Sequence, residues 1–502
     1  MREFKRVLIA NRGEIAVRII RALKTLEIES IAVFSDADAT AMHVRMADKA
    51  YHLPGFFPTE TYLVAPMIIG IAREAGCDAI HPGYGFLSES SEFSKLCTEN
   101  SIKFVGPGPT ALEISGNKLQ CKKIVEREGM PVIPYSREPI ADAGEGEKIA
   151  AELGFPVLLK SIFGGGGRGI REVKNKAEVR DAFAASEREA KTAFGRFALY
   201  IEKKLINPRH IEIQILASDD SAEFIHLGER ECSIQRRYQK LIELSPSPIL
   251  DEENRKLIAS YALRAAKAVK YSNAGTVEFL RDSSGQFYFI EINSRLQVEH
   301  PVTESVTGID LVQSQLEIAS KKKLPVRQRD VKLRGCAIEC RINAEDPYSD
   351  FAPTAGTIEY LATPSGPGVR VDTALENGSQ VSPYYDSLLA KLIVLGRDFE
   401  QARRRTLEAL DEFVIYGVDT TLPFHKSALN TERFIHGEID TGFVESSGTL
   451  EQRVVEDPTD EEFAVAAFLF ARSRSPKILV GQGKTPRPSW TKQNKERFVD
   501  AL

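Results

Sequence analysis

Along the first hundred residues, short apolar runs typical of buried strands alternate with segments in which apolar residues recur at helical spacing. Residues 6–11 (RVLIAN) form a short apolar run that predicts a buried strand, and apolar side chains then recur at helical spacing between Ile15 and Leu23. Further strands are predicted at residues 30–34 and 79–81, with a helix near residues 65–75 between them. This alternation predicts a parallel sheet covered by helices, which is an α/β domain.

The polar side of the first predicted helix carries three basic residues, Arg18, Arg21 and Lys24. At helical spacing they point away from the apolar stripe, so a solvated face is the simplest interpretation. A partner interface is the alternative interpretation for Arg18 and Arg21.

A different pattern starts at residue 131. Short strands predicted at residues 156–160 and 198–202 enclose a glycine run and a charged helix near residues 177–192. Beyond residue 206, predicted strands with interspersed helices continue to about residue 445, which indicates an α+β arrangement. Residues 446–502 combine an acidic stretch, an apolar helix predicted at 463–471 and a basic tail, and we interpret them as an appended extension.

The most informative stretch of the β-rich region is residues 276–300 (TVEFLRDSSGQFYFIEINSRLQVEH), which predicts a β-hairpin. If the loop is centred between Ser284 and Gly285, the pairing sets Glu278 opposite Glu291, although facing like charges destabilise a sheet. Period-two alternation puts Asn293 on the same face as Glu291. Two carboxylates and a carboxamide suit Mg²⁺ shared with substrate phosphates. A solvated hairpin face is an equally simple interpretation of the hairpin alone.

Composition narrows the class of protein. A chain of 502 residues exceeds one typical core, so two to four domains are expected. The net charge of −5 gives no support for nucleic-acid binding. The six cysteines form no CxxC pair, no signal-peptide pattern opens the sequence and no long apolar run predicts a membrane helix. We therefore expect a cytoplasmic protein that does not contact a membrane.

A glycine run follows the strand that contains Lys160. Gly164, Gly165, Gly166 and Gly167 precede Arg168 and Gly169, and backbone N–H groups in such a loop can surround phosphate oxygens. The same residues satisfy GxGxxG, but no helix-opening pattern follows, which argues against a dinucleotide site. A phosphate-covering flap is the favoured interpretation and a flexible linker is the alternative.

Charged residues also follow the predicted hairpin. Arg295, Gln297 and Glu299 are spaced by two, so extended chain would point them to one side, where a guanidinium would lower the pKa of the acid. A structural salt bridge explains the same triplet equally well.

Two further groups of polar residues have plain structural explanations. The cluster ECSIQRRYQK, which contains Gln235 and Lys240, also fits a charged surface helix, and Arg341 also fits an exposed position before a turn. The eight histidines show no metal-ligand spacing, so a zinc site is not expected.

Taken together, the motifs resemble biotin carboxylases over nearly all of residues 6–445. The segments that carry the resemblance are ANRGEIAVRIIRA, IHPGYGFLSES, GGGGRG, NPRHIEIQIL, ECSIQRRYQK, EINSRLQVEHPVTE, ECRINAEDP and PYYDSLLAKL. The resemblance implies the ATP-grasp fold, with a Rossmann-like N-terminal domain (residues 1–114), an ATP-grasp domain (115–330) whose mobile lid covers about 131–205, and a C-terminal domain (331–445).

The resemblance also implies roles for individual residues. Those expected to bind ATP are Lys118, Lys160, Gly164, Gly165, Gly166, Gly167, Glu202, Lys203, Leu205, His210, Gln235 and Leu280. Those expected to hold Mg²⁺ or Mn²⁺ are Glu278, Glu291 and Asn293. Those expected to bind bicarbonate or biotin are Lys240, Arg295, Gln297, Val298 and Arg341, with Glu299 as the base that deprotonates bicarbonate. Arg18, Arg21 and Arg370 correspond to homodimer-interface positions.

The implied reaction is ATP-dependent carboxylation of biotin by bicarbonate through carboxyphosphate. No lysine lies beside Met1, Met42, Met46, Met67 or Met130, as the family's biotin-attachment motif requires, so biotin is expected on a separate carrier protein. A carboxyltransferase subunit would then choose the acyl acceptor. The alternatives are another ATP-grasp ligase, or a catalytically weakened scaffold subunit, which Phe163 before the glycine run and Tyr238, in place of the family's histidine, would favour. An NAD-binding module is a more distant alternative.

Overall fold

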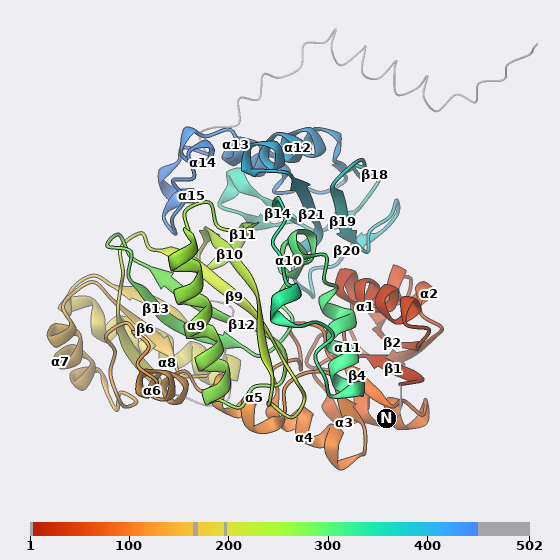
Figure 1. The fold of residues 1–502 in the computed structure, drawn as a ribbon, viewed down its shortest axis with the longest axis horizontal. Helices are drawn as coiled ribbons and strands as arrows, with labels where there is room; N and C mark the ends of the chain where they lie inside the picture. The colour runs from red at the N-terminus through yellow and green to blue at the C-terminus, as the bar shows by residue number, and fades with distance from the viewer. Residues whose placement is uncertain (1–3, 164–168, 195–197, 450–502) are drawn as a thin grey trace, which may run out of the picture. The chain divides into compact units, whose positions relative to one another are not determined.

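The computed structural model describes residues 4–163, 169–194 and 198–449 (Figure 1). Its N-terminal sheet has the strand order β3-β2-β1-β4-β5, and every neighbouring pair is parallel. The prediction of a parallel sheet is therefore confirmed. The strands are β1 (Arg6–Ile9), β2 (Glu29–Ser35), β3 (Lys49–Leu53), β4 (Ala79–His81) and β5 (Lys103–Phe104). The accompanying helices are α1 (Gly13–Thr25), α2 (Met42–Met46), α3 (Ala65–Glu74), α4 (Ser91–Glu99) and α5 (Pro109–Gly116).

The polar side of α1 corrects one expectation. Arg18 is not solvated: it is 7% exposed and its guanidinium forms ion pairs with Glu304 at 2.9 Å and Asp310 at 2.7 Å. Arg21 and Lys24 are exposed, as expected. Helical spacing placed all three residues on one side, but it could not show that α11 (Leu311–Lys321) packs against that side of the helix at Arg18.

A small antiparallel sheet follows, with the order β7-β6-β8. Its strands are β6 (Val157–Ser161), β7 (Ile170–Val173) and β8 (Leu199–Lys203), and its helices are α7 (Ala143–Leu153) and α8 (Val179–Phe194). Both strands predicted around the glycine run are thus confirmed within a residue or two. The four glycines Gly164–Gly167 themselves lie outside the described residues. Helix α6 (Lys118–Arg127) precedes this sheet in the chain.

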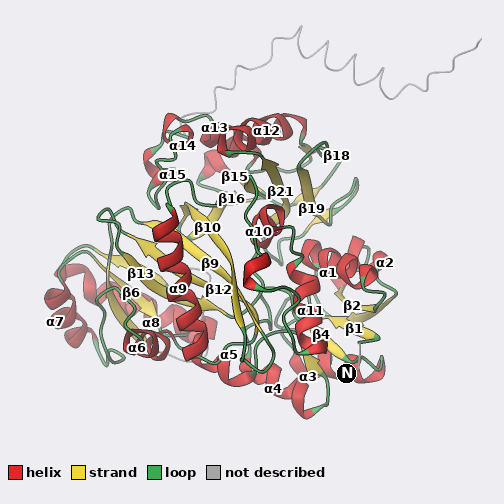
Figure 2. Cartoon of the chain, in the orientation of Figure 1, coloured by secondary structure: helices red, strands yellow, loops and turns green. Residues whose placement is uncertain are grey.

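The largest sheet is antiparallel and has the strand order β13-β12-β9-β10-β11-β14-β21-β19 (strands drawn yellow in Figure 2). Its strands are β9 (Arg209–Ala217), β10 (Phe224–Arg236), β11 (Gln239–Ser245), β12 (Asn273–Arg281), β13 (Phe287–Asn293), β14 (Cys336–Asn343), β19 (Val369–Thr373) and β21 (Leu388–Gly396). The helices that follow β11 are α9 (Glu252–Ala268), α10 (His300–Thr307), α11, α12 (Phe399–Glu412), α13 (Leu422–Leu429), α14 (Glu432–Ile435) and α15 (Phe443–Ser446). Short strands form three two-stranded pairs: β15 (Glu345–Asp346) with β16 (Ala352–Pro353), β17 (Gly356–Thr357) with β20 (Gln380–Val381), and β18 (Tyr360–Ala362) with β22 (Val414–Tyr416).

The two faces of this large sheet are chemically different. Ile211, Ile213 and Ile215 of β9 point to one face and join a core with the apolar side of α9. The alternate residues His210, Glu212 and Gln214 point to the other face. These polar side chains are also buried. Helix α10 contacts β10, β11, β14 and β21, and its Val302 and Val306 pack with Ala337 and Ile393.

The cluster ECSIQRRYQK is a hairpin, which excludes the surface-helix interpretation. Gln235 of β10 pairs with Lys240 of β11, and the two-residue turn consists of Arg237 and Tyr238. Both turn residues have positive φ, +49° and +65°, as a two-residue turn of type I′ requires. The usual Asn-Gly signal is absent at this turn, so the pattern did not reveal it.

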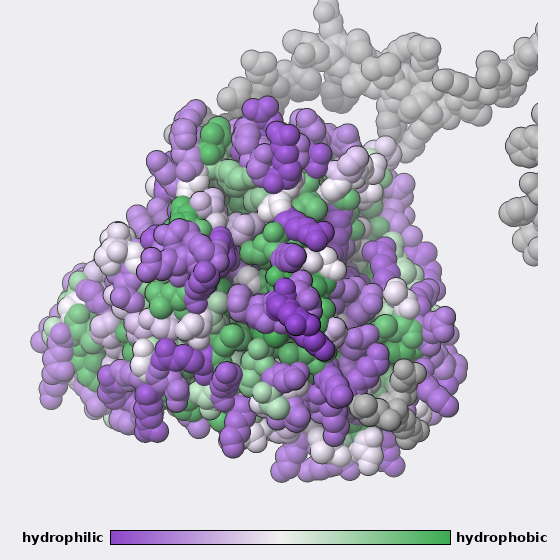
Figure 3. Space-filling model, viewed as in Figure 1, coloured by the Kyte–Doolittle hydropathy of each residue, from purple (hydrophilic) through white to green (hydrophobic). Residues whose placement is uncertain are grey.

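The surface of the described residues is mainly polar. Figure 3 shows hydrophilic side chains over most of the visible face, with smaller apolar areas between them. Within the described ranges, every helix is too short or too polar to cross a membrane.

Candidate active site

The predicted site begins with a row of charged residues across four strands. Arg230, Glu212, Glu278 and Glu291 are successive Cα partners on β10, β9, β12 and β13. Strand pairing therefore forces three carboxylates onto one line of one face. The prediction that Glu278 faces Glu291 is confirmed.

The prediction assumed a hairpin loop centred between Ser284 and Gly285, and this position was wrong by half a residue. Phe279 pairs with Phe289 and Arg281 with Phe287, which centres the hairpin on Ser284 rather than between Ser284 and Gly285. An irregularity between Glu278 and Phe279 adds one residue to β13 and restores the predicted partner. A β-bulge is a common device for redirecting a side chain beside a functional site.

Lys240 connects three carboxylates of the site. Its Nζ lies 2.7 Å from Glu212, 2.9 Å from Glu278 and 2.6 Å from Glu299. Arg230, which is fully buried, forms a second ion pair with Glu212. Burial would raise the pKa of the Glu278 carboxyl, but Lys240 and His210 outweigh it and hold that pKa well below its usual range.

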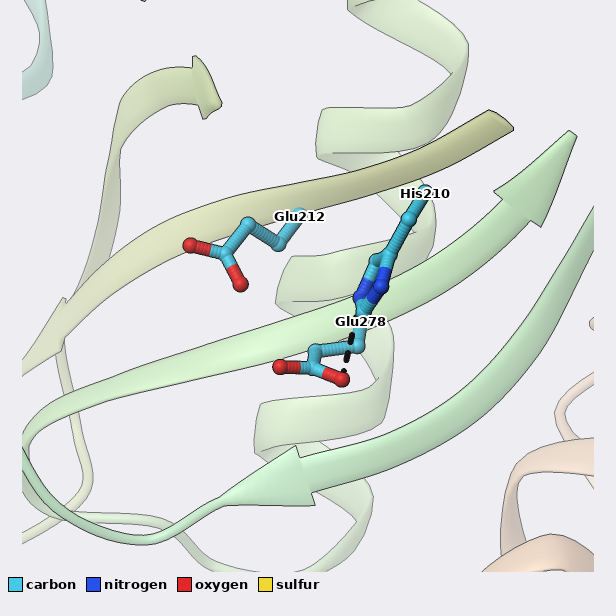
Figure 4. Close-up of side chains that lie close together, drawn as sticks. All are labelled: His210, Glu212 and Glu278. Atoms are coloured by element: carbon cyan, nitrogen blue, oxygen red, sulfur yellow. Dashed lines mark ion pairs between the residues drawn. The ribbon is translucent and has the colours of Figure 1, made fainter. Parts of the chain in front are cut away.

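Three sets of residues could hold a divalent cation, and one of them is Glu212, Cys232 and Glu299. Ligand atoms of His210, Glu212 and Glu278 lie within 4.8 Å of one another (Figure 4). A hard cation prefers oxygen donors to the His210 nitrogen. The predicted set of Glu278, Glu291 and the Asn293 carboxamide offers oxygen donors only, although Glu278 and Glu291 already pair with Lys240 and Lys118.

Glu299 lies where the chain enters α10, not in extended chain as its spacing suggested. Its backbone torsions, φ −80° and ψ 11°, place it in the turn before His300. Its fully buried carboxylate contacts Lys240 and the Arg341 guanidinium at 2.9 Å. Burial opposes ionisation, but Lys240 and the guanidinium groups of Arg341 and Arg230 hold the pKa of Glu299 well below its usual range. The guanidinium neighbour is thus Arg341, not Arg295.

Arg341 lies on β14 between two carboxylates and is not an exposed turn residue. It binds Glu299 through one nitrogen and Glu243 through another. Burial raises the pKa of Glu243 to about 7, against the opposing effect of Arg341. The Arg341 carbonyl oxygen accepts hydrogen bonds from Thr421 at 2.9 Å and His425 at 2.7 Å. Its backbone and its side chain are therefore both fixed.

The predicted nucleotide-binding residues form their own ion pairs. Lys118 lies 3.1 Å from Glu291, and Lys160 pairs with Glu202. Lys122 also contacts Glu202, at 2.7 Å. These two lysines overcome the effect of burial and lower the pKa of Glu202 to about 2. The lysines Lys118, Lys122 and Lys160 are therefore all held by carboxylates, and Lys118 contacts Glu291 of the row described above.

The remaining predicted residues lie around these pairs. Gln235 contacts His210 Nδ1 at 2.6 Å, and Leu280 is the Cα partner of His210. Arg295 contacts Gln297 at 3.0 Å and Glu89 at 3.2 Å. Lys203 ends β8 and donates to the carbonyls of Gly154 and Phe155, and Leu205 follows half-buried.

Sequence reasoning missed four charged residues that hold this arrangement in place: Lys122, Glu212, Arg230 and Glu243. A signal for Glu212 was present in NPRHIEIQIL, where His210, Glu212 and Gln214 alternate with isoleucines. Such alternation usually marks a solvated face, so it gave no reason to place these residues inside.

Three family models match consecutive parts of the chain. "Biotin carboxylase, N-terminal domain" matches residues 3–112, "Carbamoyl-phosphate synthase L chain, ATP binding domain" matches residues 117–327, and "Biotin carboxylase C-terminal domain" matches residues 339–446. The middle model shares its name with the rival ligase class, but both flanking models are those of biotin carboxylases. Fold and site together define an ATP-grasp ligase.

Curated relatives agree over most of the chain. Biotin carboxylase 1 of Bacillus subtilis is 48% identical over 88% of this chain and 98% of its own length. The biotin carboxylase of a Nostoc species is 48% identical over 88% of this chain and 99% of its own length. The chain therefore belongs to the biotin carboxylase family, as its motifs predicted.

Solved structures show the same fold. The biotin carboxylase domain dimer of Hydrogenobacter thermophilus 2-oxoglutarate carboxylase, in complex with MgADP, ADP and bicarbonate, has a TM-score of 0.88 at 46% identity, covering 90% of this chain and 100% of that one. Campylobacter jejuni biotin carboxylase, in a β,γ-ATP complex, has a TM-score of 0.85 at 44% identity, covering 88% and 99%.

Proposed function

We propose that this chain carboxylates biotin with bicarbonate at the expense of ATP, yielding carboxybiotin, ADP and phosphate. The observation that carries the proposal is the cluster in which Lys240, Arg341 and Glu299 meet beside the carboxylates Glu278 and Glu291. It combines a base, anion-binding cations and oxygen ligands for a metal within one buried site.

The first step is deprotonation of bicarbonate by Glu299. Lys240 and Arg341 stabilise the ionised carboxylate, which makes it a weak base as long as both ion pairs are intact. Bicarbonate and ATP phosphates compete for the same two cations. Weakening the two ion pairs raises the pKa of Glu299 when the substrates are present, which strengthens the base at the moment of reaction.

The deprotonated bicarbonate oxygen then attacks the γ-phosphorus of ATP, and ADP leaves. In the proposed reaction Lys118 and Lys160, which pair with Glu291 and Glu202, offset the charge on the phosphates once these draw them away from the two acids. Glu278, Glu291 and Asn293 would hold Mg²⁺ or Mn²⁺, which would supply Lewis-acid stabilisation of the same phosphates.

The product of that attack, carboxyphosphate, decomposes in water, so the site has to exclude solvent. The glycines Gly164–Gly167 are proposed to cover the phosphates as part of the lid. Decomposition yields CO₂ and phosphate, and phosphate takes the proton from biotin N1′. The nitrogen attacks CO₂ while Arg341 stabilises the developing oxyanion of the ureido ring.

The proposal includes partners. Biotin arrives on a separate carrier protein, and a carboxyltransferase subunit consumes carboxybiotin. A homodimer is proposed because the Hydrogenobacter thermophilus relative is described as a dimer. Arg21, which is exposed, and Arg370 are then the better interface candidates, since Arg18 is buried inside one chain.

The domain division and the location are also proposals. The matched family models end at residues 112, 327 and 446, which supports boundaries near 114, 330 and 445. A cytoplasmic location is proposed on the basis of the cysteine pattern, and cell fractionation tests it.

The test measures ADP and carboxybiotin formation from ATP, bicarbonate and free biotin. We expect bicarbonate-dependent ATP cleavage that biotin stimulates, and a loss of about 10²–10⁴-fold in Glu299→Gln. Glu432→Gln, at an exposed position, serves as the control variant. A folded wild-type chain that cleaves ATP only with ammonia, or without any bicarbonate dependence, would contradict the proposal.

A further inference from the structure

Lys391 on β21 is a charged residue that the proposed chemistry does not use. Its side chain is fully buried, which is costly for an ammonium group unless polar partners surround it. Across the sheet, its Cα partners are Arg341 on β14 and Asp372 on β19. It therefore lies one strand away from the Arg341 guanidinium and on the same face.

Three groups from three parts of the chain surround the ammonium. Its Nζ donates to the backbone carbonyl of Val298 at 3.1 Å and lies 3.1 Å from Glu14 of α1. Asp372 is more distant, at 3.8 Å. Val298 is the residue between Gln297 and Glu299, in the turn that leads into α10.

Charge pairing explains part of this lysine's environment, because its ammonium group acts to lower the pKa of both Glu14 and Asp372, but each of these carboxyls also has another partner. Asp372 already accepts two hydrogen bonds from Arg370, at 2.9 and 2.7 Å. Glu14 already accepts a hydrogen bond from the Tyr84 hydroxyl, and burial raises the pKa of its carboxyl. The contact that nothing else in the described structure supplies is the one to the Val298 carbonyl.

The carbonyl oxygen of the preceding residue, Gln297, is also bound by buried hydrogen-bond donors. The Gln297 carbonyl oxygen accepts from the backbone N–H of His300 at 3.3 Å and contacts His300 Nδ1 at 2.7 Å. Two successive peptide groups are thus fixed by buried donors. The Glu299 carboxylate, one residue later, contacts Lys240 and Arg341.

We propose that Lys391 is a positioning residue that orients the turn formed by Gln297, Val298 and Glu299 through the Val298 carbonyl. The proposal rests on the function proposed above, in which this turn binds and deprotonates bicarbonate. Lys391 does not touch the substrate. It orients the residues of the turn that do. Its ion pair with Glu14 also connects this turn to α1, the helix that follows β1 of the N-terminal sheet.

Steady-state kinetics of Lys391→Met separate this role from a general structural one. We expect the KM for bicarbonate to rise by about 10-fold or more, because small misplacements of reacting groups are expensive in rate and binding. The KM for ATP is expected to stay within about twofold, since the lysines that face the phosphates are untouched. An equal rise in both KM values would contradict the proposal.

The double variant Lys391→Met/Glu14→Gln is the control for a folding defect in the single variant. It removes both members of the 3.1 Å ion pair, so neither Lys391 nor Glu14 leaves the other as an unpaired charge, while Arg370 keeps Asp372 paired. We expect a recovered melting temperature with the KM for bicarbonate still raised. A folded double variant with the wild-type KM for bicarbonate would overturn the proposal.

A measurement without substrates keeps this inference distinct from the proposed function. Hydrogen–deuterium exchange in the peptide spanning residues 296–304 is expected to be at least about 10-fold faster in the double variant than in wild type. Unchanged exchange there would overturn the positioning role. Absence of bicarbonate-dependent ATP cleavage in the wild type would instead contradict the proposed function.

Discussion

The two large sheets of this protein bury their strands in different ways. β1 and β4 of the parallel N-terminal sheet are buried and mainly apolar, with the half-buried Arg6 starting β1 and the buried His81 ending β4, as expected where helices cover both faces. β9 of the eight-stranded sheet alternates isoleucines with His210, Glu212 and Gln214, yet all of these residues are buried. Its polar face is covered by other parts of the chain and not by water.

The difference between the two sheets shows where the buried charged residues lie. The parallel sheet gains stability mainly from apolar burial, although it also contains the buried His81 and the Arg6–Glu29 ion pair. On the polar face of the eight-stranded sheet, the carboxylates of Glu212, Glu243, Glu278 and Glu291 each pair with a lysine or an arginine, because an unpaired buried charge is strongly destabilising. Glu339 of β14 differs from them: its buried carboxyl forms no ion pair within the described residues, and burial raises its pKa well above the usual range. The same pairs can be released to anionic substrates. The comparison predicts that substitutions in the two sheets will change the free energy of unfolding by different amounts. It also predicts that the loss can be restored by a second substitution on the charged face.

The largest effect is expected from Arg230→Met. Arg230 is fully buried and binds Glu212, Gln214, Thr276 and Thr303. Its loss leaves carboxylates underpaired and is expected to reduce the free energy of unfolding by about 3–5 kcal/mol. Urea denaturation measures the change.

The matched double variant Arg230→Met/Glu212→Gln tests whether charge is the cause. It is expected to recover at least half of the lost stability, since the unpaired carboxylate is removed as well. A single variant that costs less than about 1 kcal/mol would show that the row of charges is not needed for folding.

The second prediction concerns one buried histidine near each sheet. Burial lowers the pKa of His425, beside Arg341, to about 4 and that of His81 on β4 to about 3. Both are neutral in the folded protein, so their contribution is full above the unfolded pKa near 6.5 and is lost as pH falls toward the folded values. Each shift corresponds to about 3–5 kcal/mol.

Unfolding measured between pH 7 and pH 4 checks this expectation. His425→Gln should flatten the loss of stability with falling pH, and His81→Gln should do so to a similar extent. His436→Gln, an exposed residue, serves as the control and should leave the slope unchanged. A slope unaffected by either buried substitution would contradict histidine burial as the cause of the pH dependence.

The smallest effect is expected in the parallel sheet. Ile31 of β2 is fully buried among apolar side chains. Ile31→Val removes one methylene and should cost about 0.5–1.5 kcal/mol without changing activity. Thermal unfolding together with the ADP assay checks both parts, and a loss of activity at unchanged stability would contradict the division between the two sheets.

Local patterns were sufficient where the physics is local. The apolar runs of β1, β2 and β4, the helical stripe of α1 and the facing pair Glu278–Glu291 all depend on neighbours along the chain or across one hairpin. Even there, the hairpin register was correct only because a bulge in β13 offset the misplaced loop centre. The long motifs then identified the family, which the similarity to known biotin carboxylases confirmed.

Tertiary structure alone decided which polar residues are buried and which cation each acid meets. Arg18 was expected in solvent and instead binds residues nearly 300 positions away, and Glu299 lies in a turn against Arg341 rather than beside Arg295. Lys240, Arg341 and Lys391 meet the turn before α10 because β11, β14 and β21 are neighbours in one sheet. Residue type and spacing determine the chemistry that a chain can carry. Burial and pairing between distant segments decide which residues perform it, because only packing removes the water that would otherwise screen them.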